Sequence, residues 1–198
     1  MNTSQSPPLV VGIAGASGAI LGVRTLDACR ELGIETHLVI SKAATLTLAQ
    51  EAGLSVAEVQ TRASVCHRAG DVGAAIASGS FPTLGMIIAP CSVRTMSEIA
   101  TGVTSSLLSR AADVTLKERR RLVLMVRETP LHLGHLRTLV TLAEMGAVIA
   151  PPAPAFYAAP ARIEDIVDQS VGRVLDLFGF AWRPVRRWGR DIGPEAAP

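Results

Sequence analysis

Five short segments of almost entirely apolar residues, separated by stretches with helical spacing, limit the folds that this chain can adopt. The segments cover residues 9–14, 37–40, 84–90, 122–126 and 147–150. Strands that are apolar on both sides must be covered on both faces, as they are in parallel sheets flanked by helices. Strands that alternate with helices form βαβ units. The sequence therefore predicts a single α/β domain with three layers (αβα) and a mainly parallel sheet.

The stretches between and after these strands predict the helices. Helical spacing of apolar residues covers 19–32, a stretch that ends at Glu51, 104–118, 132–144 and 163–178. Gly33 suits the end of the first helix, and Ser92 is placed to cap a helix after the third strand. Residues 52–80 show no regular pattern. We expect three parts of the chain: a flexible leader over 1–8, one domain over 9–180 and a peripheral tail over 181–198.

The composition excludes several classes of protein. Of the 198 residues, 48% are hydrophobic, which excludes a disordered chain, and the net charge of +2 gives no reason to expect a nucleic-acid partner. No apolar run approaches the ~20 residues of a membrane-spanning helix, and the polar first residues are unlike a signal peptide. The cysteines lack metal-binding spacing. We expect a cytoplasmic protein with no metal, which buries its apolar excess between the subunits of a homo-oligomer.

Glycine and polar residues follow each predicted strand. They are Gly15, Ala16, Ser17 and Gly18 after the first strand, Ser41 and Lys42 after the second, 91–95 after the third, 127–129 after the fourth, and Tyr157 after the fifth. Each alone is compatible with a helix cap, a tight turn or an exposed charge. The carboxyl ends of parallel strands meet at one edge, so together they predict a cleft for a phosphorylated, partly apolar ligand. We expect the helix after Gly18 to offer free N–H groups to an anion.

Three further features have a structural interpretation that competes with a functional one. His132 and His135 have a spacing that metal ligands use, but no carboxylate or cysteine at matching spacing is nearby, which favours packing or capping of a helix. Cys91 has no evident His–Asp partner and is expected to be a small buried thiol. The basic run 117–121 ends a predicted helix, where cations are favourable, so a solvated helix end is expected.

Several motifs, in order along the chain, resemble those of the flavin prenyltransferases of the UbiX type. They are GASGAI (15–20), IASGSF (76–81), APCS (89–92), RAADVTLKERRR (110–121), VRETPLH (126–132), PPAPAFY (151–157) and VGRVLD (171–176). The resemblance implies a Rossmann-like or flavodoxin-like fold, a homododecamer with active sites at subunit junctions, and a metal-independent transferase. Such an enzyme joins a dimethylallyl group from dimethylallyl monophosphate to N5 and C6 of reduced FMN. Its product, prenylated FMN, serves a UbiD-type decarboxylase, in ubiquinone biosynthesis or in the degradation of aromatic acids.

The resemblance also implies roles for individual residues. FMN would be contacted by Gly15, Ala16, Ser17, Ser41, Ser92, Val93, Arg94, Thr95 and Arg127. The prenyl phosphate would be bound by Tyr157 and Arg173, with Lys117 and Arg127 reaching it across an interface. The residues implied in catalysis are Ser17, Glu51, Lys117 and Glu128. Either Glu128 or the retained phosphate would remove the proton at ring closure, and Phe81 or Phe156 would shelter the allyl cation.

Two other functions remain open on the sequence. A related flavoprotein that decarboxylates peptidyl or pantothenoyl cysteine would share the fold and FMN, but it would not need Tyr157 and Arg173 as a phosphate clamp. A non-catalytic FMN carrier would bind flavin without turnover.

Overall fold

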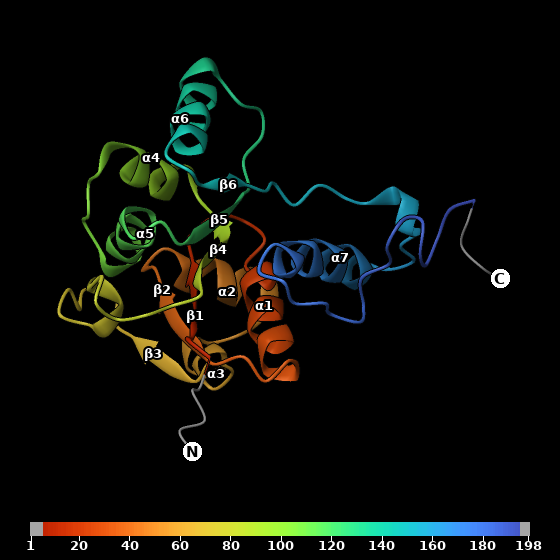
Figure 1. The fold of residues 1–198 in the computed structure, drawn as a ribbon, viewed down its shortest axis with the longest axis horizontal. Helices are drawn as coiled ribbons and strands as arrows, with labels where there is room; N and C mark the ends of the chain where they lie inside the picture. The colour runs from red at the N-terminus through yellow and green to blue at the C-terminus, as the bar shows by residue number, and fades with distance from the viewer. Residues whose placement is uncertain (1–5, 195–198) are drawn as a thin grey trace.

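The sheet consists of six parallel strands in the order β3-β2-β1-β4-β5-β6 (Figure 1). The strands are β1 (Leu9–Ile13), β2 (Thr36–Ile40), β3 (Val65–His67), β4 (Gly85–Cys91), β5 (Arg121–Val126) and β6 (Val148–Ile149). The structure is a computed structural model that describes residues 6–194. The predicted three-layer fold with a parallel sheet is confirmed, and its strand order is that of the Rossmann type.

The edge strand β3 lies within 52–80, where the sequence predicts no regular structure. It has only three residues, and Val65 and Cys66 are exposed, so it lacks the apolar run that marks the other strands. The short helix α3 (Val56–Gln60) precedes it and begins with a capping box formed by Ser55 and Glu58. Pairing with β2, rather than the strand's own composition, therefore determines β3.

Helices cover both faces of the sheet. On one face lie α4 (Val93–Thr101), α5 (Leu107–Lys117) and α6 (Leu133–Glu144), and on the other lie α1 (Ile20–Glu31), α2 (Ala44–Ala52) and α7 (Ile163–Asp176) (Figure 1). The helices predicted from the spacing of apolar residues are thus present, with ends that differ by a few residues.

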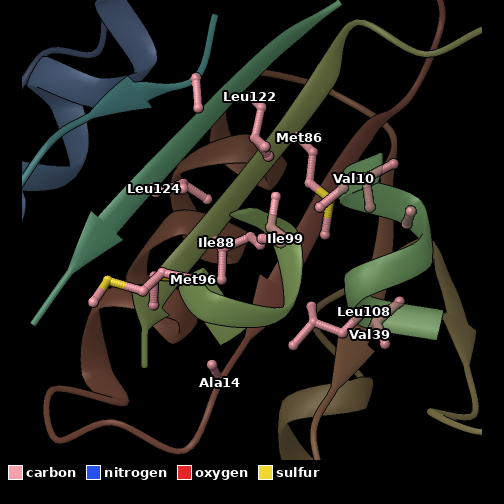
Figure 2. Close-up of a cluster of buried hydrophobic side chains, with 14 of the residues drawn as sticks. Val10, Ala14, Val39, Met86, Ile88, Met96, Ile99, Leu108, Leu122 and Leu124 are labelled. Atoms are coloured by element: carbon pink, nitrogen blue, oxygen red, sulfur yellow. The ribbon is translucent and has the colours of Figure 1, made fainter. Parts of the chain in front are cut away.

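The core follows the alternation of side chains along the strands. Val10 of β1, Ile88 of β4 and Leu124 of β5 point to the side of α4 and α5, where they pack with Met96 and Leu108 (Figure 2). Neighbouring residues on the same strands point to the opposite face and pack against α1 and α7. The central strands are therefore buried on both sides, as their apolar sequences predict.

Helix α1 packs very closely on the sheet. A Cβ atom added to Gly22 would lie 2.3 Å from the carbonyl oxygen of Ala89 and 2.7 Å from a side-chain carbon of Ile13. Only glycine permits this approach. Because α1 begins directly after residues 14–18, the close packing fixes the position of that loop at the carboxyl edge of the sheet.

After β6 the chain extends away from the sheet and returns through α7 (Figure 1). The short 3₁₀ helix η2 (Phe156–Ala158) lies in the outer part of this arm. The segment predicted as a peripheral tail contributes buried side chains. Trp182 is only 2% exposed and donates an indole hydrogen bond of 2.7 Å to Glu31, and Val185 fills the space beside Gly172.

Parts of the predicted leader and tail, residues 1–5 and 195–198, lie outside the described residues. Pro8 is buried, and its carbonyl oxygen accepts a hydrogen bond from the Leu84 amide at 2.9 Å. Among residues 6–194, no helix combines the length and the apolar character needed to cross a membrane.

Candidate active site

Backbone hydrogen bonds join the loops at the carboxyl ends of four neighbouring strands. The Ser41 amide donates to the Ile13 carbonyl at 2.9 Å, the Ala14 amide to the Pro90 carbonyl at 3.1 Å, and the Arg127 amide to the Cys91 carbonyl at 3.2 Å. The loops after β2, β1, β4 and β5 therefore form one continuous surface at the carboxyl ends of the strands, the carboxyl edge of the sheet. The chain reverses its direction of winding between β1 and β4, which is where ligands bind in open α/β sheets.

The loop after β1 is held close to α2. A Cβ atom on Gly15 would lie 2.3 Å from that of Ala43, so only glycine fits here, and Gly18 has a φ of +95°. Glu51, on α2, accepts hydrogen bonds from the amides of Gly18 at 2.7 Å and Ala19 at 3.2 Å. The sequence thus places a carboxylate at the start of α1.

Glu51 stays ionised in this position. Partial burial would raise its pKa, but hydrogen bonds from the Gly18 amide, the Ser17 hydroxyl and the Ala19 amide, together with the charge of Arg127, hold the pKa below its ordinary value. The expectation that this helix end has free N–H groups for an anion is therefore wrong for Gly18 and Ala19. The arrangement brings three predicted site residues together: Ser17, Glu51 and Arg127.

In the part of the chain that the structure describes, the first turn of α4 offers amides to which no carboxylate is bound. Ser92 caps this helix as predicted, because its hydroxyl oxygen accepts from the Thr95 amide at 3.2 Å. Within residues 6–194, the amides of Val93 and Arg94 have no acceptor. The guanidinium of Arg94 is 82% exposed and pairs with Glu98, so Arg94 offers its backbone amide to this site. Two free amides beside the Ser92 and Thr95 hydroxyls suit a phosphate.

Ser41 and Glu128 lie in the two outer loops of this edge, after β2 and after β5. The Ser41 oxygen accepts from the Ala44 amide at 3.2 Å, which leaves its hydroxyl hydrogen available to a ligand. Glu128 is exposed, and one of its carboxylate oxygens accepts from the Thr129 amide at 2.9 Å. Because Glu128 directly follows Arg127, the edge combines one cation with two carboxylates, Glu51 and Glu128, which is a set capable of proton transfer.

The structural interpretations of Cys91 and His132 are confirmed. Cys91 is fully buried, and burial raises the pKa of its thiol to about 12, so it is not a nucleophile. His132 caps α6, since its Nδ1 atom accepts from the amides of Gly134 and His135. Among the residues that the structure describes, no group of three or more His, Cys, Asp or Glu side chains is arranged to hold a metal ion.

Tyr157 and Arg173 form a second group, next to the carboxyl end of β6. The hydroxyl of Tyr157 accepts from the amide nitrogen of Gln169 at 3.4 Å, and Arg173 follows Gln169 by about one helical turn on α7. Arg173 lines a cavity of about 210 Å³ together with Met125 and Ala150. Both side chains are about half exposed, 46% for Tyr157 and 55% for Arg173, so they remain accessible to a ligand.

Gln169 is not among the residues that the sequence predicts at the site. It is 4% exposed, and its amide also bonds both the N–H and the C=O of Arg186. The sequence signal that could have identified Gln169 is its place as a polar residue on an otherwise apolar helix face.

Lys117 lies at the opposite ends of the strands, that is, at the amino edge of the sheet, where the strands begin. It is the last residue of α5, just before β5 begins, whereas Arg127 follows the end of that strand. A six-residue strand separates the two, which is about 20 Å. The loop before β4, which carries Phe81, approaches Lys117 at Gly79, and Phe156 is 78% exposed on the outer arm. One chain alone therefore does not bring Lys117 to Ser17, Glu51 and Arg127.

Comparisons with known proteins agree with this geometry. Residues 1–175 match the family described as Flavoprotein. The flavin prenyltransferase UbiX of Escherichia coli (strain K12) is 60% identical over 173 residues, which cover 87% of this chain and 92% of that protein. The crystal structure of AnUbiX (PadA1) in complex with FMN and dimethylallyl pyrophosphate has a TM-score of 0.92 and 48% identity, covering 93% of this chain and 98% of that one. A dodecameric FMN-dependent UbiX-like decarboxylase from Escherichia coli O157:H7 has a TM-score of 0.90 and 48% identity, covering 91% of this chain and 98% of that one.

Proposed function

This chain belongs to the flavin prenyltransferases, and on that premise we propose that it joins a dimethylallyl group from dimethylallyl monophosphate to N5 and C6 of reduced FMN. The observation that carries the proposal is the single edge on which Ser17, Glu51 and Arg127 meet beside an anion-binding helix start at Ser92. We further propose that the product, prenylated FMN, is used by a UbiD-type decarboxylase in ubiquinone biosynthesis or the decarboxylation of aromatic acids.

FMN fits the donors of the carboxyl edge. The free amides of Val93 and Arg94 and the hydroxyls of Ser92 and Thr95 suit its phosphate, and the Ser41 hydroxyl lies on the neighbouring loop. Gly15, Ala16 and Ser17 form a wall with little side-chain bulk, against which a flat ring can lie. Reduced FMN supplies the nucleophilic N5 and C6 atoms.

The cationic residues stabilise the departure of phosphate. As the allylic C–O bond breaks, the phosphate leaves with the electron pair, and positive charge develops on the allyl carbons. Arg127, Arg173 and Lys117 would stabilise the phosphate charge, and the Tyr157 hydroxyl would hold one of its oxygens. Preorganised charges of this kind contribute about 3–4 kcal/mol each to lowering a barrier.

Carboxylates and a hydroxyl would accept and transfer the protons of the reaction. Ring closure forms a bond between C6 and the prenyl chain: the double bond of the chain takes up a proton, and C6 releases one. We assign removal of the C6 proton to Glu128 or to the retained phosphate. Glu51 is hydrogen-bonded to Ser17 and is kept anionic, so this pair can accept or relay a proton next to the flavin.

Assembly would complete the site. Because Lys117 lies at the far edge of its own sheet, it would reach the prenyl phosphate of a neighbouring subunit. Helix α6 supports assembly: Leu133, Leu136 and Val140 form an exposed apolar stripe on it. Exposed apolar stripes of this kind mark interfaces. We propose a homododecamer, as in the Escherichia coli O157:H7 relative, located in the cytoplasm.

The proposed function is tested by mass spectrometry of the flavin after anaerobic incubation with reduced FMN and dimethylallyl monophosphate. The expected result is a gain of one C5H8 unit, absent with the Arg127→Gln variant. Unmodified FMN recovered from a protein that binds it would exclude this donor, and a parallel incubation with the diphosphate then tests the other donor.

The same assay separates the two rival functions. Glu128→Gln is expected to bind FMN normally and to form little product, whereas an FMN carrier would be unaffected by this change. Release of CO₂ from a peptidyl or pantothenoyl cysteine, without any prenylated flavin, would instead support the cysteine decarboxylase.

A further inference from the structure

The basic run that contains Lys117 is not simply a solvated helix end. Arg120 turns inward, and its NH1 donates to the Phe81 carbonyl at 2.7 Å and to the Thr83 hydroxyl at 3.3 Å. Its NH2 donates to the Gly79 carbonyl, also at 2.7 Å. The guanidinium therefore spans two carbonyl groups of the loop before β4, and Arg120 is half-buried there.

This loop, residues 78–83, lies directly against Lys117. A Cβ atom on Gly79 would lie 2.6 Å from Nζ of Lys117 and would also collide with the carboxylate of Glu118. Lys117 and Glu118 form an ion pair, and the Lys117 hydrogen bond, the charge of Lys117 and, to a lesser extent, the charge of Arg120 lower the pKa of Glu118. The position of the Lys117 ammonium thus depends on where the Gly79 backbone is held.

Other contacts hold the start of the loop and the Phe81 ring: Arg110 donates to the Ala77 carbonyl at 3.3 Å, and Phe81 packs against the core. The Phe81 ring packs on His37, with ring centroids 5.2 Å apart, and Ser78 and Ser80 hydrogen-bond to each other at 2.9 Å. The serine pair lies within the loop and does not tie it to the rest of the molecule. Arg120 is accordingly the side chain that joins the loop backbone to the α5–β5 connection, which also carries Lys117.

We propose that Arg120 is a positioning residue for prenyl transfer: by clamping the Gly79 and Phe81 carbonyls, it holds Lys117 in the orientation that reaches the neighbouring subunit's substrate. This proposal rests on the proposed function, in which Lys117 stabilises the prenyl phosphate. A planar fork with donors at fixed separation can bond two carbonyls at once, whereas the point charge of a lysine bonds one of them.

The test is Arg120→Lys, which keeps the charge and loses the fork, compared with Arg119→Lys at the exposed neighbouring position. Arg120→Lys is expected to lower kcat/KM for the prenyl phosphate about 10- to 100-fold, the cost of misplacing a reacting group by about 1 Å. The affinity for FMN, the melting temperature and the size of the assembly are expected to stay at wild-type values. Arg119→Lys is expected to match the wild type in every measurement.

A double-mutant cycle separates positioning from a general structural role. In a Lys117→Ala background, Arg120→Lys is expected to cause little further loss, because the two changes act on one group. A full additional loss, or wild-type kcat/KM in Arg120→Lys alone, would overturn the proposal. Failure of the proposed function itself is distinguishable, because the wild-type protein would then form no prenylated flavin.

Discussion

The two edges of the sheet are built in different ways. At the carboxyl edge, backbone hydrogen bonds connect one loop to the next, and glycine at position 15 lets the loops approach. At the amino edge, backbone bonds such as the one from the Leu84 amide to the Pro8 carbonyl also join neighbouring segments, and a side chain, Arg120, spans the gap between a loop and a helix end. Both edges therefore have backbone bonds, and the amino edge depends in addition on the guanidinium of Arg120 to hold the loop before β4.

The distance between the two edges allows one short chain to carry a site with many charged groups. Arg127 and Lys117, placed side by side in one subunit, would repel each other before any substrate was bound. The fold instead puts them about 20 Å apart, at the two ends of β5. In the proposed assembly, the two edges of different chains would meet.

Mixing inactive variants tests whether the two edges of different subunits share a site. Lys117→Ala and Arg127→Ala are each expected to lower kcat/KM by about 100-fold or more. If the edges of different subunits share a site, co-expressed mixed assemblies of the two variants regain activity, in about one quarter of their sites. A mixture of Arg127→Ala with Glu51→Gln, both at the carboxyl edge, is the control and regains none. No recovery in the first mixture would mean that the two edges do not cooperate.

A change within the carboxyl edge alone tests the role of the Glu51 carboxylate. Glu51→Gln removes the charge that accepts from Gly18 and Ala19 and is expected to slow prenylation about 100-fold. FMN affinity, measured by titration of flavin fluorescence, is expected to change little, since the phosphate site at Ser92 is intact. A loss of FMN binding with unchanged turnover of the bound fraction would contradict the assigned role.

A change on the exposed face of α6 tests whether assembly joins the two edges. Leu136→Asp places a charge in the apolar stripe of α6 and is expected to weaken assembly, so that activity falls on dilution. Analytical ultracentrifugation and assays over a range of protein concentrations measure both effects. Arg137→Gln, on the same helix, is the control. Full activity from dissociated Leu136→Asp subunits would show that one chain suffices.

The stability of the folded chain is expected to depend weakly on pH through two histidines, His37 and His67. Burial lowers the pKa of His37 below its ordinary value of 6.5, although Glu35 acts in the opposite direction. Burial and the neighbouring His37 likewise lower the pKa of His67, against the charge of Asp71. The unfolded chain therefore binds more protons below about pH 6.5, so stability is complete above that pH and declines on acidification. Thermal melts from pH 7.5 to 5 are expected to show this decline, with a smaller slope in His67→Gln; an equal slope would contradict it.

The sequence predicts the parts of the molecule in which local signals agree. Ser92 as a helix cap, Cys91 as a buried thiol and the apolar central strands are examples, because capping chemistry and burial act within a few residues. The approach of Glu51 to Gly18 spans 33 positions of the chain and leaves no local mark, so only the resemblance to a family pointed to Glu51.

Residues in polar segments, at a helix end or after the last helix, were the least predictable from the sequence. Arg120 lies in a basic run whose sequence is typical of an exposed helix end. Its inward orientation depends on carbonyl groups 39 and 41 positions away in the sequence. Trp182 likewise lies in a segment rich in Arg and Pro, and its burial depends on a partner, Glu31, in the first helix. In both cases tertiary contacts outweigh the local composition.

The carboxylate that Glu51 presents to the start of α1 has a consequence for ligand selectivity. The strand order is the one in which dinucleotides usually place their pyrophosphate at this first helix. Here the protein's own negative charge already occupies that position, and a pyrophosphate would meet electrostatic repulsion instead of free amides. We therefore expect nicotinamide and flavin dinucleotides to bind poorly at the first turn, and the same strand order to serve a mononucleotide.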